Sequence, residues 1–226
     1  MESTAVAAGP PGRPNYYNDE DFFRTEAAAG VVRDALGRRV VRAADDLLAA
    51  LAGALGQEVG DAAGEILYKL GRRWGEAEAR ACAERAPREF GVESIERMNM
   101  NVLLETWRWP LTAAGWGTWR HDFRRARQGL PVVELYDSAA AAAHGPAQKP
   151  VCHLYAGLFA AVFSHLAGRE LAGVELQCAA TGADCCRFVV TTPPRAAAAA
   201  RLRDEGVPAD EVLQRLGGPA ASAPQG

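Results

Sequence analysis

The stretch PVCHLYAGLFAAVFSHLAG at residues 150–168 constrains the fold more than any other part of the sequence. Pro150 is suited to open a helix, and the apolar residues after it lie on almost every side of that helix rather than along one stripe. No apolar run in the chain reaches the roughly 18 residues that a membrane-spanning helix needs. The helix over 151–166 must therefore be buried, with a sheet on one side and other helices or a second subunit on another.

Apolar residues at helical spacing predict further helices upstream of this segment. We expect one or two helices within 26–54. Another should run from Asp61, as its cap, to Pro87. A third is expected over 93–113, where Pro110 kinks or closes it.

Two pairs of segments have the composition of β-hairpins. GWGTWRHDF (115–123) and LPVVELYDS (130–138) are rich in β-branched and aromatic residues and flank a short turn. Two more strands are expected at about 171–180 and 184–192, on either side of a glycine-containing turn. The sequence thus predicts both helices and antiparallel strand pairs.

Composition and charge narrow the class of protein. With 226 residues, 49% of them hydrophobic, the chain can bury a sizeable core in one domain, expected over 21–192. A flexible arm is expected at 1–20, and a C-terminal helix and tail at 193–226. Residues 195–216 could form one more helix, whose apolar residues are too sparse to promise docking. The net charge of −3 provides no basic field for nucleic acid. Without an export signal or membrane segment, we expect a cytoplasmic protein.

The chain has five cysteines, at positions 82, 152, 178, 185 and 186. A reducing compartment does not maintain structural disulfides, so metal binding or redox chemistry remains as their role. The second hairpin brings Glu175 and Cys178 close to the adjacent cysteines at 185 and 186, which indicates a metal site, and zinc is the metal that such ligands favour. Cys152, at the start of the buried helix, supplies a further ligand. The alternative is that the hairpin cysteines are small core residues.

The spacing Cys152-X22-Glu175-X2-Cys178-X7-Cys186 resembles the zinc site of the 4-vinyl reductase domain family, including the sensor domains of phenol-responsive transcription activators. EILYKLGRRWG, GWGTWRHD and the segment from PVCHLY to CCRFVV are also similar to that family, so the resemblance covers about residues 45–192. Cys186 is in register with the family's Cys-X-Phe pattern, and Cys185 remains an alternative ligand.

The resemblance implies an α+β fold in which helices pack on an antiparallel sheet, related to vesicle-tethering subunits of the TRAPP type. It also implies a structural Zn²⁺, a homodimer and an apolar pocket for a small hydrophobic or aromatic ligand. Phenol-responsive activators carry an ATPase module and a DNA-binding helix-turn-helix after this domain, whereas only about thirty residues follow it here. We therefore expect a module that acts through a separate protein effector.

Four aromatic residues are candidates to line the ligand pocket: Trp107, Trp116, Phe159 and Phe163. The alternative is that these rings, like most tryptophans at such spacing, are core.

Two kinds of function follow. We favour a sensor or carrier domain; the alternative is an enzyme or accessory subunit of the 4-vinyl reductase type, acting on a hydrophobic substrate such as a tetrapyrrole or a polyketide-like intermediate. No cofactor fingerprint, Ser-His-Asp set or carboxylate pair identifies catalytic residues.

Overall fold

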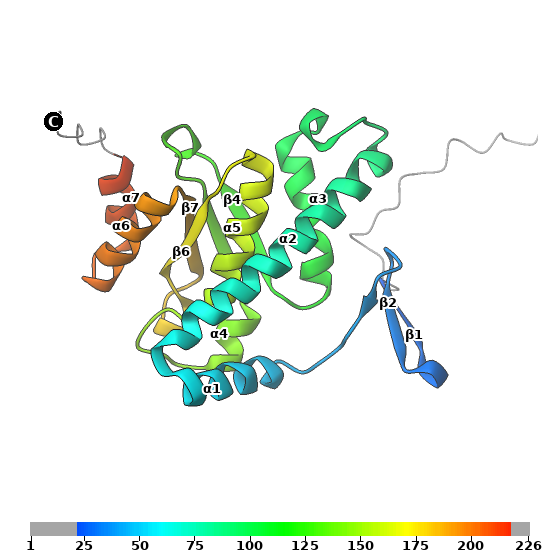
Figure 1. The fold of residues 1–226 in the computed structure, drawn as a ribbon, viewed down its shortest axis with the longest axis horizontal. Helices are drawn as coiled ribbons and strands as arrows, with labels where there is room; N and C mark the ends of the chain where they lie inside the picture. The colour runs from blue at the N-terminus through cyan, green and yellow to red at the C-terminus, as the bar shows by residue number, and fades with distance from the viewer. Residues whose placement is uncertain (1–21, 218–226) are drawn as a thin grey trace, which may run out of the picture.

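A four-stranded antiparallel sheet with helices on both faces forms the centre of the molecule (Figure 1). The computed structural model describes residues 22–217. The strands lie in the order β4-β5-β7-β6 and comprise Thr118–Asp122 (β4), Val132–Tyr136 (β5), Ala172–Gln177 (β6) and Cys186–Thr191 (β7). Both predicted hairpins are confirmed, since β4 pairs with β5 and β6 with β7. Pairing of β5 with β7 joins the hairpins into one sheet, and the α+β fold expected from the sequence is present.

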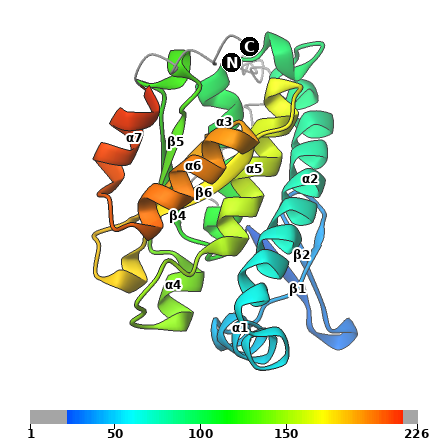
Figure 2. The same ribbon diagram turned by 60° about the vertical axis from the view of Figure 1, so that its left-hand side comes forward.

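The two faces of the sheet bury different side chains because successive residues of a strand point to opposite sides. On β7, Phe188 and Val190 belong to the larger core, which also contains helix α5 (His153–Ala167). Val189 points the other way, into a second core that includes helices α6 (Pro193–Asp204) and α7 (Ala209–Gly217). Figure 2 shows α6 and α7 on one side of the strands and α5 with α2 on the other.

Helix α5 packs against helix α2 (Ala63–Phe90) with the two backbones in direct contact. All ten residues from Leu154 to Phe163 are buried, as the apolar sequence predicts. A Cβ atom added to Gly157 of α5 would lie 2.0 Å from the Tyr68 carbonyl oxygen, and one added to Gly71 of α2 would lie 1.9 Å from the Leu154 carbonyl oxygen. Side chains at these positions would push the helices apart, so glycine sets their separation.

The C-terminal segment differs from the sequence-based expectation. Residues 193–217 form two helices, separated near Gly206, which has a φ of +80°. They also dock, because small Ala196 and Ala199 of α6 together with Val212 and Leu213 of α7 cover the outer face of the sheet. Alanines were too small to register as an apolar stripe, yet they allow α6 to lie close to β6.

The N-terminal prediction is also wrong in part. In place of helix, residues from Phe23 to Val40 form a small antiparallel sheet, with strands Phe23–Glu26 (β1), Val31–Asp34 (β2) and Arg39–Val40 (β3). Turns at Gly30 and Gly37, with φ of +62° and +79°, interrupt any helix there. Helix α1 begins only at Asp46 and ends at Val59. The predicted arm at 1–20 and the last nine residues of the predicted tail lie outside the described residues.

The remaining helices differ from prediction at their ends. Pro87 lies inside α2, which continues to Phe90 and closes on Gly91. Helix α3 (Met100–Ala113) starts later than expected, where the Asn99 side chain accepts hydrogen bonds from the first turn, and Pro110 lies within it. A short helix α4 (Ala139–His144) precedes α5. Between residues 22 and 217, no helix is both long and apolar enough to cross a bilayer.

We expect Gly157→Ala to lower the free energy of unfolding by about 3 kcal/mol, because the new methyl group meets the α2 backbone and neither helix can yield. The measurement is urea denaturation followed by circular dichroism. Gly53→Ala in α1 is the matched control, since nothing lies within 4 Å of the added Cβ and alanine favours helix. Equal stability of the Gly157→Ala variant and the wild type would contradict the backbone contact.

Candidate functional site

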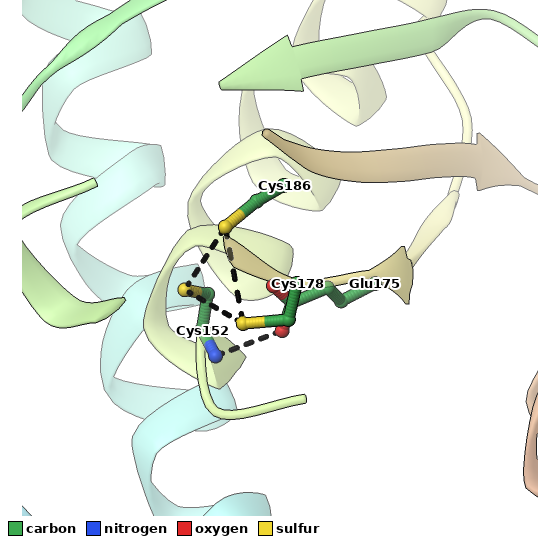
Figure 3. A group of neighbouring side chains, drawn as sticks. All are labelled: Cys152, Glu175, Cys178 and Cys186. Atoms are coloured by element: carbon green, nitrogen blue, oxygen red, sulfur yellow. Dashed lines mark hydrogen bonds between the residues drawn. The ribbon is translucent and has the colours of Figure 1, made fainter. Parts of the chain in front are cut away.

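Three thiols and one carboxylate meet where the start of α5 faces the β6–β7 hairpin (Figure 3). Cys152 directly precedes α5, and Glu175 lies on β6. Cys178 follows the end of β6, and Cys186 is the first residue of β7. All four are buried, and their ligand atoms lie within 4.8 Å of one another. We call these four residues the Cys3Glu group.

An irregularity in β6 allows Glu175 and Cys178 to meet. In a regular strand, residues three apart point to opposite faces. Here Glu175 pairs with Phe188 and Gln177 with Arg187, so β6 contains one more residue than its partner strand over this interval. Such a bulge shifts the alternation by one position and brings the carboxylate and the thiol to the same side.

The distances between the sulfur atoms suit a metal ion. The Sγ atom of Cys152 lies 3.9 Å from that of Cys178 and 3.7 Å from that of Cys186, and the remaining pair is 3.9 Å apart. These separations are far longer than a disulfide bond of about 2.05 Å. They agree with the edge of about 3.8 Å expected for a tetrahedron with zinc–sulfur bonds of about 2.3 Å.

The polar atoms around the Cys3Glu group are arranged for anionic ligands. The Cys152 backbone N–H donates to Glu175 Oε2 at 2.8 Å, and the Ala179 N–H donates to Cys186 Sγ at 3.3 Å. The Ser138 hydroxyl accepts from the Ala141 N–H, and its oxygen lies at hydrogen-bonding distance, 3.3 Å, from Cys152 Sγ. Glu175 Oε1 is buried without a hydrogen-bond partner among the described residues, and a cation would satisfy it.

Burial makes full ionisation of the group unfavourable in the absence of a cation. Burial and the neighbouring Cys178 raise the pKa of the Glu175 carboxyl well above its usual value. Hydrogen bonds with Cys178 and Cys186, together with burial, raise the pKa of the Cys152 thiol. A divalent metal ion replaces such protons when it binds, so the donor set and its surroundings fit a metal centre.

Cys185 lies outside the Cys3Glu group although it is adjacent to Cys186. It precedes the first residue of β7, and its carbonyl oxygen accepts a hydrogen bond from Gln177 Nε2 at 3.1 Å. The lone Cys82 is buried on α2, where burial raises its pKa to about 11.

A second feature is a cluster of aromatic rings between α3, α5 and β4, which we call the aromatic cluster. Its centre is Trp107 of α3, whose ring centroid lies 5.3 Å from that of Trp119 on β4 and 6.2 Å from that of Phe159 on α5. His121 adjoins it at 6.4 Å from Trp107, and Phe163 lies 6.0 Å from His121. Three of the four predicted pocket residues thus belong to one cluster.

Three ring nitrogens in the aromatic cluster have no hydrogen-bond partner among residues 22–217: Trp107 Nε1, Trp119 Nε1 and His121 Nε2, all buried. Burial lowers the pKa of His121 to about 4, so its ring is neutral at pH 7. His121 is not among the four pocket residues predicted from the sequence. The signal for it was available, because Trp119 and His121 are two apart on a strand and share a face.

The fourth predicted pocket residue, Trp116, lies elsewhere. Its ring packs against Trp74 of α2, with centroids 4.5 Å apart, and its carbonyl oxygen accepts a hydrogen bond from the Tyr155 hydroxyl at 2.5 Å. It lines an apolar cavity of about 250 Å³ between α1, α2 and α4, which we call the α1 groove. Residues lining this groove include Leu48, Leu51, Leu70, Trp74, Val151 and Leu154.

Comparison with known proteins finds a family model that matches the segment containing this site. Residues 131–192, which span β5 to β7 and contain the whole Cys3Glu group, match the model of the 4-vinyl reductase domain. The sequence of this segment is thus similar to that of the 4-vinyl reductase domain family. No curated protein matches the sequence.

Two solved structures are similar to this chain. The phenol-responsive sensory domain of the transcription activator PoxR, crystallised with phenol, has a TM-score of 0.61 and 20% identity, covering 90% of this chain and 96% of that one. A vinyl-4-reductase family protein from Methanocaldococcus jannaschii has a TM-score of 0.39 and 16% identity, covering 55% and 66%. The likeness to the PoxR domain establishes a shared fold.

Within the segment that matches the family, the two adjacent cysteines provide a matched test of metal binding. We expect Cys186→Ser to lose bound metal and to lower the melting temperature, because it removes one sulfur ligand from a buried group of four. Cys185→Ser should retain both, since Cys185 lies outside the group. Elemental analysis of the purified proteins gives the metal content. Loss of metal from Cys185→Ser alone would reverse the assignment.

The neutral His121 should make stability depend on pH. Its pKa is about 4 in the folded protein, against an ordinary value of 6.5, so the unfolded chain takes up the proton first as the pH falls. The free energy of unfolding should therefore decrease by about 2 kcal/mol between pH 7 and pH 5 from this residue. Denaturation of wild type and His121→Gln at both pH values isolates this effect, since acid release of metal affects both proteins. Parallel pH profiles would contradict it.

Proposed function

We propose that this protein is a small-molecule sensor or carrier domain, in which a structural zinc ion fixes the fold and the aromatic cluster binds a small uncharged aromatic ligand. The observation that carries the proposal is the set of three buried ring nitrogens, without partners among residues 22–217, inside an otherwise apolar cluster. Unpaired buried polar groups cost free energy, and a guest with one hydroxyl group can satisfy them.

The proposed zinc would be held by Cys152, Glu175, Cys178 and Cys186. Four protein ligands complete a tetrahedral shell and leave no position for a reacting water, so the ion would serve as a cross-link rather than a catalyst. These residues come from the start of α5 and from both strands of the β6–β7 hairpin. The cross-link therefore holds the helix that carries Phe159 and Phe163 against the sheet.

The chemistry of the aromatic cluster supports a neutral ligand. A neutral imidazole can donate or accept a hydrogen bond, and an indole N–H donates. Rings from three elements supply flat apolar surfaces, which suit an aromatic guest. The PoxR domain, whose fold is similar, was crystallised with phenol, and a phenol-like molecule has the size and the single hydroxyl that this cluster would accept.

Access to the aromatic cluster would be from the α2 side. The cavity beside Trp107, between α2, α3 and α5, holds about 10 Å³, less than one aromatic ring, so a ligand requires the rings to move apart. A larger open cavity of about 310 Å³ reaches the same Trp107 ring from solvent and is bordered by Arg38 and Glu78. These groups form an ion pair with Nη1 to Oε2 at 3.0 Å.

A homodimer and a separate protein effector complete the proposal.

Trp119→Phe tests the ligand site, because it removes the indole N–H and keeps an aromatic ring. We expect phenol to raise the melting temperature of the wild type and to bind this variant about ten-fold more weakly, the loss of one hydrogen bond in a buried site. Calorimetric titration gives the affinity, and benzene, which lacks the hydroxyl, should bind more weakly than phenol to the wild type.

Trp74→Phe is the control for this experiment, since Trp74 contacts Trp116 in the α1 groove and not the aromatic cluster. It should bind phenol like the wild type. If a panel of phenols, cresols and unsubstituted aromatics leaves the melting temperature unchanged, the proposed ligand class is wrong. If Trp74→Phe weakens binding and Trp119→Phe does not, the ligand binds in the groove instead.

A further inference from the structure

The small N-terminal sheet lies to one side of the molecule and is joined to α1 by an extended segment (Figure 1). Residues 41–45, which form this segment, are all exposed. Of the residues in β1, β2 and β3, Asp34 alone is buried. Segments with few buried contacts open locally at a lower cost in free energy than the core does. The small sheet can therefore move while the four-stranded sheet and its helices stay intact.

The turn between β2 and β3 lines the open cavity of about 310 Å³ that reaches Trp107. Leu36 and Arg38 belong to this turn, whereas the other residues that line the cavity belong to α2 and α3. Direct backbone contacts with α5 hold α2 in place. The part of the cavity wall that the turn provides is therefore the part that is free to move.

Arg38 joins this turn to α2. Its Nη1 atom donates to both carboxylate oxygens of Glu78, each at 3.0 Å, and its Nε atom donates to Asp34 Oδ2 at 2.8 Å. The other carboxylate oxygen of Asp34 accepts from the backbone N–H groups of Leu36 and Arg38, at 3.0 and 2.9 Å. A buried carboxylate thus shapes the turn and keeps the Arg38 side chain directed at Glu78.

The contact between Arg38 and Glu78 has the strength of a latch that opens and closes. The two side chains are 35% and 15% exposed, so water reaches the ion pair. Ion pairs of this kind are weak and break readily. Because Asp34 still holds Arg38 after the pair breaks, the pair re-forms with little further ordering of the side chain.

We propose that the β2–β3 turn is a lid on the passage from solvent to the aromatic cluster, and that the ion pair between Arg38 and Glu78 is its latch. This inference adds a means of regulating access to the ligand site and rests on the proposed function for the identity of the ligand. The lid lies outside the aromatic cluster and does not contact a ligand bound there. It therefore changes the association and dissociation rates by the same factor and leaves the affinity unchanged.

Cys82 of α2 provides a reporter of lid opening that needs no ligand. It lines both the open cavity and the smaller cavity beside Trp107, and it is 6% exposed. A small alkylating reagent that enters the open cavity meets this thiol. The rate of alkylation at Cys82 therefore measures how often the lid opens.

The experiment is alkylation by iodoacetamide, followed by mass spectrometry of the peptide that contains Cys82. All proteins carry Cys185→Ser, which removes the other cysteine that lies outside the Cys3Glu group. We expect Glu78→Gln and Arg38→Ala each to raise the alkylation rate of Cys82 about five-fold, the change expected from losing one partly exposed ion pair.

The pair of variants separates access from ionisation of the thiol. Burial raises the pKa of Cys82; of the two latch residues, Glu78 raises it and Arg38 lowers it. The two substitutions therefore shift this pKa in opposite directions. An increase in the alkylation rate of both variants reports access to the thiol, whereas opposite changes would show an electrostatic effect alone and overturn the inference.

Two controls accompany the measurement. Arg33→Ala should react like the wild type, because Arg33 pairs with Glu26 inside the small sheet, with Nε to Oε1 at 3.7 Å. Cys152, which is fully buried in the Cys3Glu group, should stay unmodified in every variant. Equal rates at Cys82 in the wild type and both latch variants, or alkylation of Cys152 together with Cys82, would overturn the lid.

Stopped-flow mixing with phenol, followed by tryptophan fluorescence, connects the lid to the ligand site. Both latch variants should bind and release phenol about five-fold faster with the same Kd. If phenol binds at equal rates in all variants, the passage lies elsewhere and the inference is wrong. If alkylation rates rise as expected but phenol does not bind, the proposed ligand is wrong and the lid over the cavity stands.

Discussion

The close approach of three backbones fixes the rest of this fold. Helix α5 touches α2 at Gly71 and Gly157, and it touches β6 at Gly173, where an added Cβ would lie 2.3 Å from the Ala156 carbonyl oxygen. Because no side chain separates these segments, the helix has little freedom to slide or rotate. The sites of this molecule are all positioned relative to α5: the Cys3Glu group at its start, the aromatic cluster along its later turns, and the α1 groove beside its first turn.

The Cys3Glu group reinforces this arrangement at the start of α5. The start of a helix leaves N–H groups without partners inside the helix. One of those N–H groups, that of Cys152, donates to Glu175, so the carboxylate both caps the helix and offers its other oxygen to a cation. Because folding brings these ligands together from segments more than twenty residues apart, a metal ion bound by them would stabilise the folded state.

Many elements of the fold, and the residues of the Cys3Glu group, could be predicted from the sequence because strong local patterns determine them. The apolar run of α5, the two hairpins and the spacing of the Cys3Glu residues led to the right elements and brought together the right thiols. Where tertiary packing decides, prediction failed: alanines of α6 carry no periodic signal, and Gly30 and Gly37 redirected a valine-rich segment into strands. Trp116 was predicted to share a pocket with Phe159 and Phe163. It precedes β4 by a turn at Gly117, which has a φ of +97°, and its ring packs against Trp74 instead.

The shape of α5 also has a mechanical consequence. The helix has fifteen residues and is about 22 Å long. Direct backbone contacts with α2 and β6 hold it in place. Val151 and Leu154 at one end line the α1 groove, while Phe159 and Phe163 further along touch the aromatic cluster. Because these contacts leave α5 little freedom to slide or rotate, the rings and the groove keep a fixed position relative to each other.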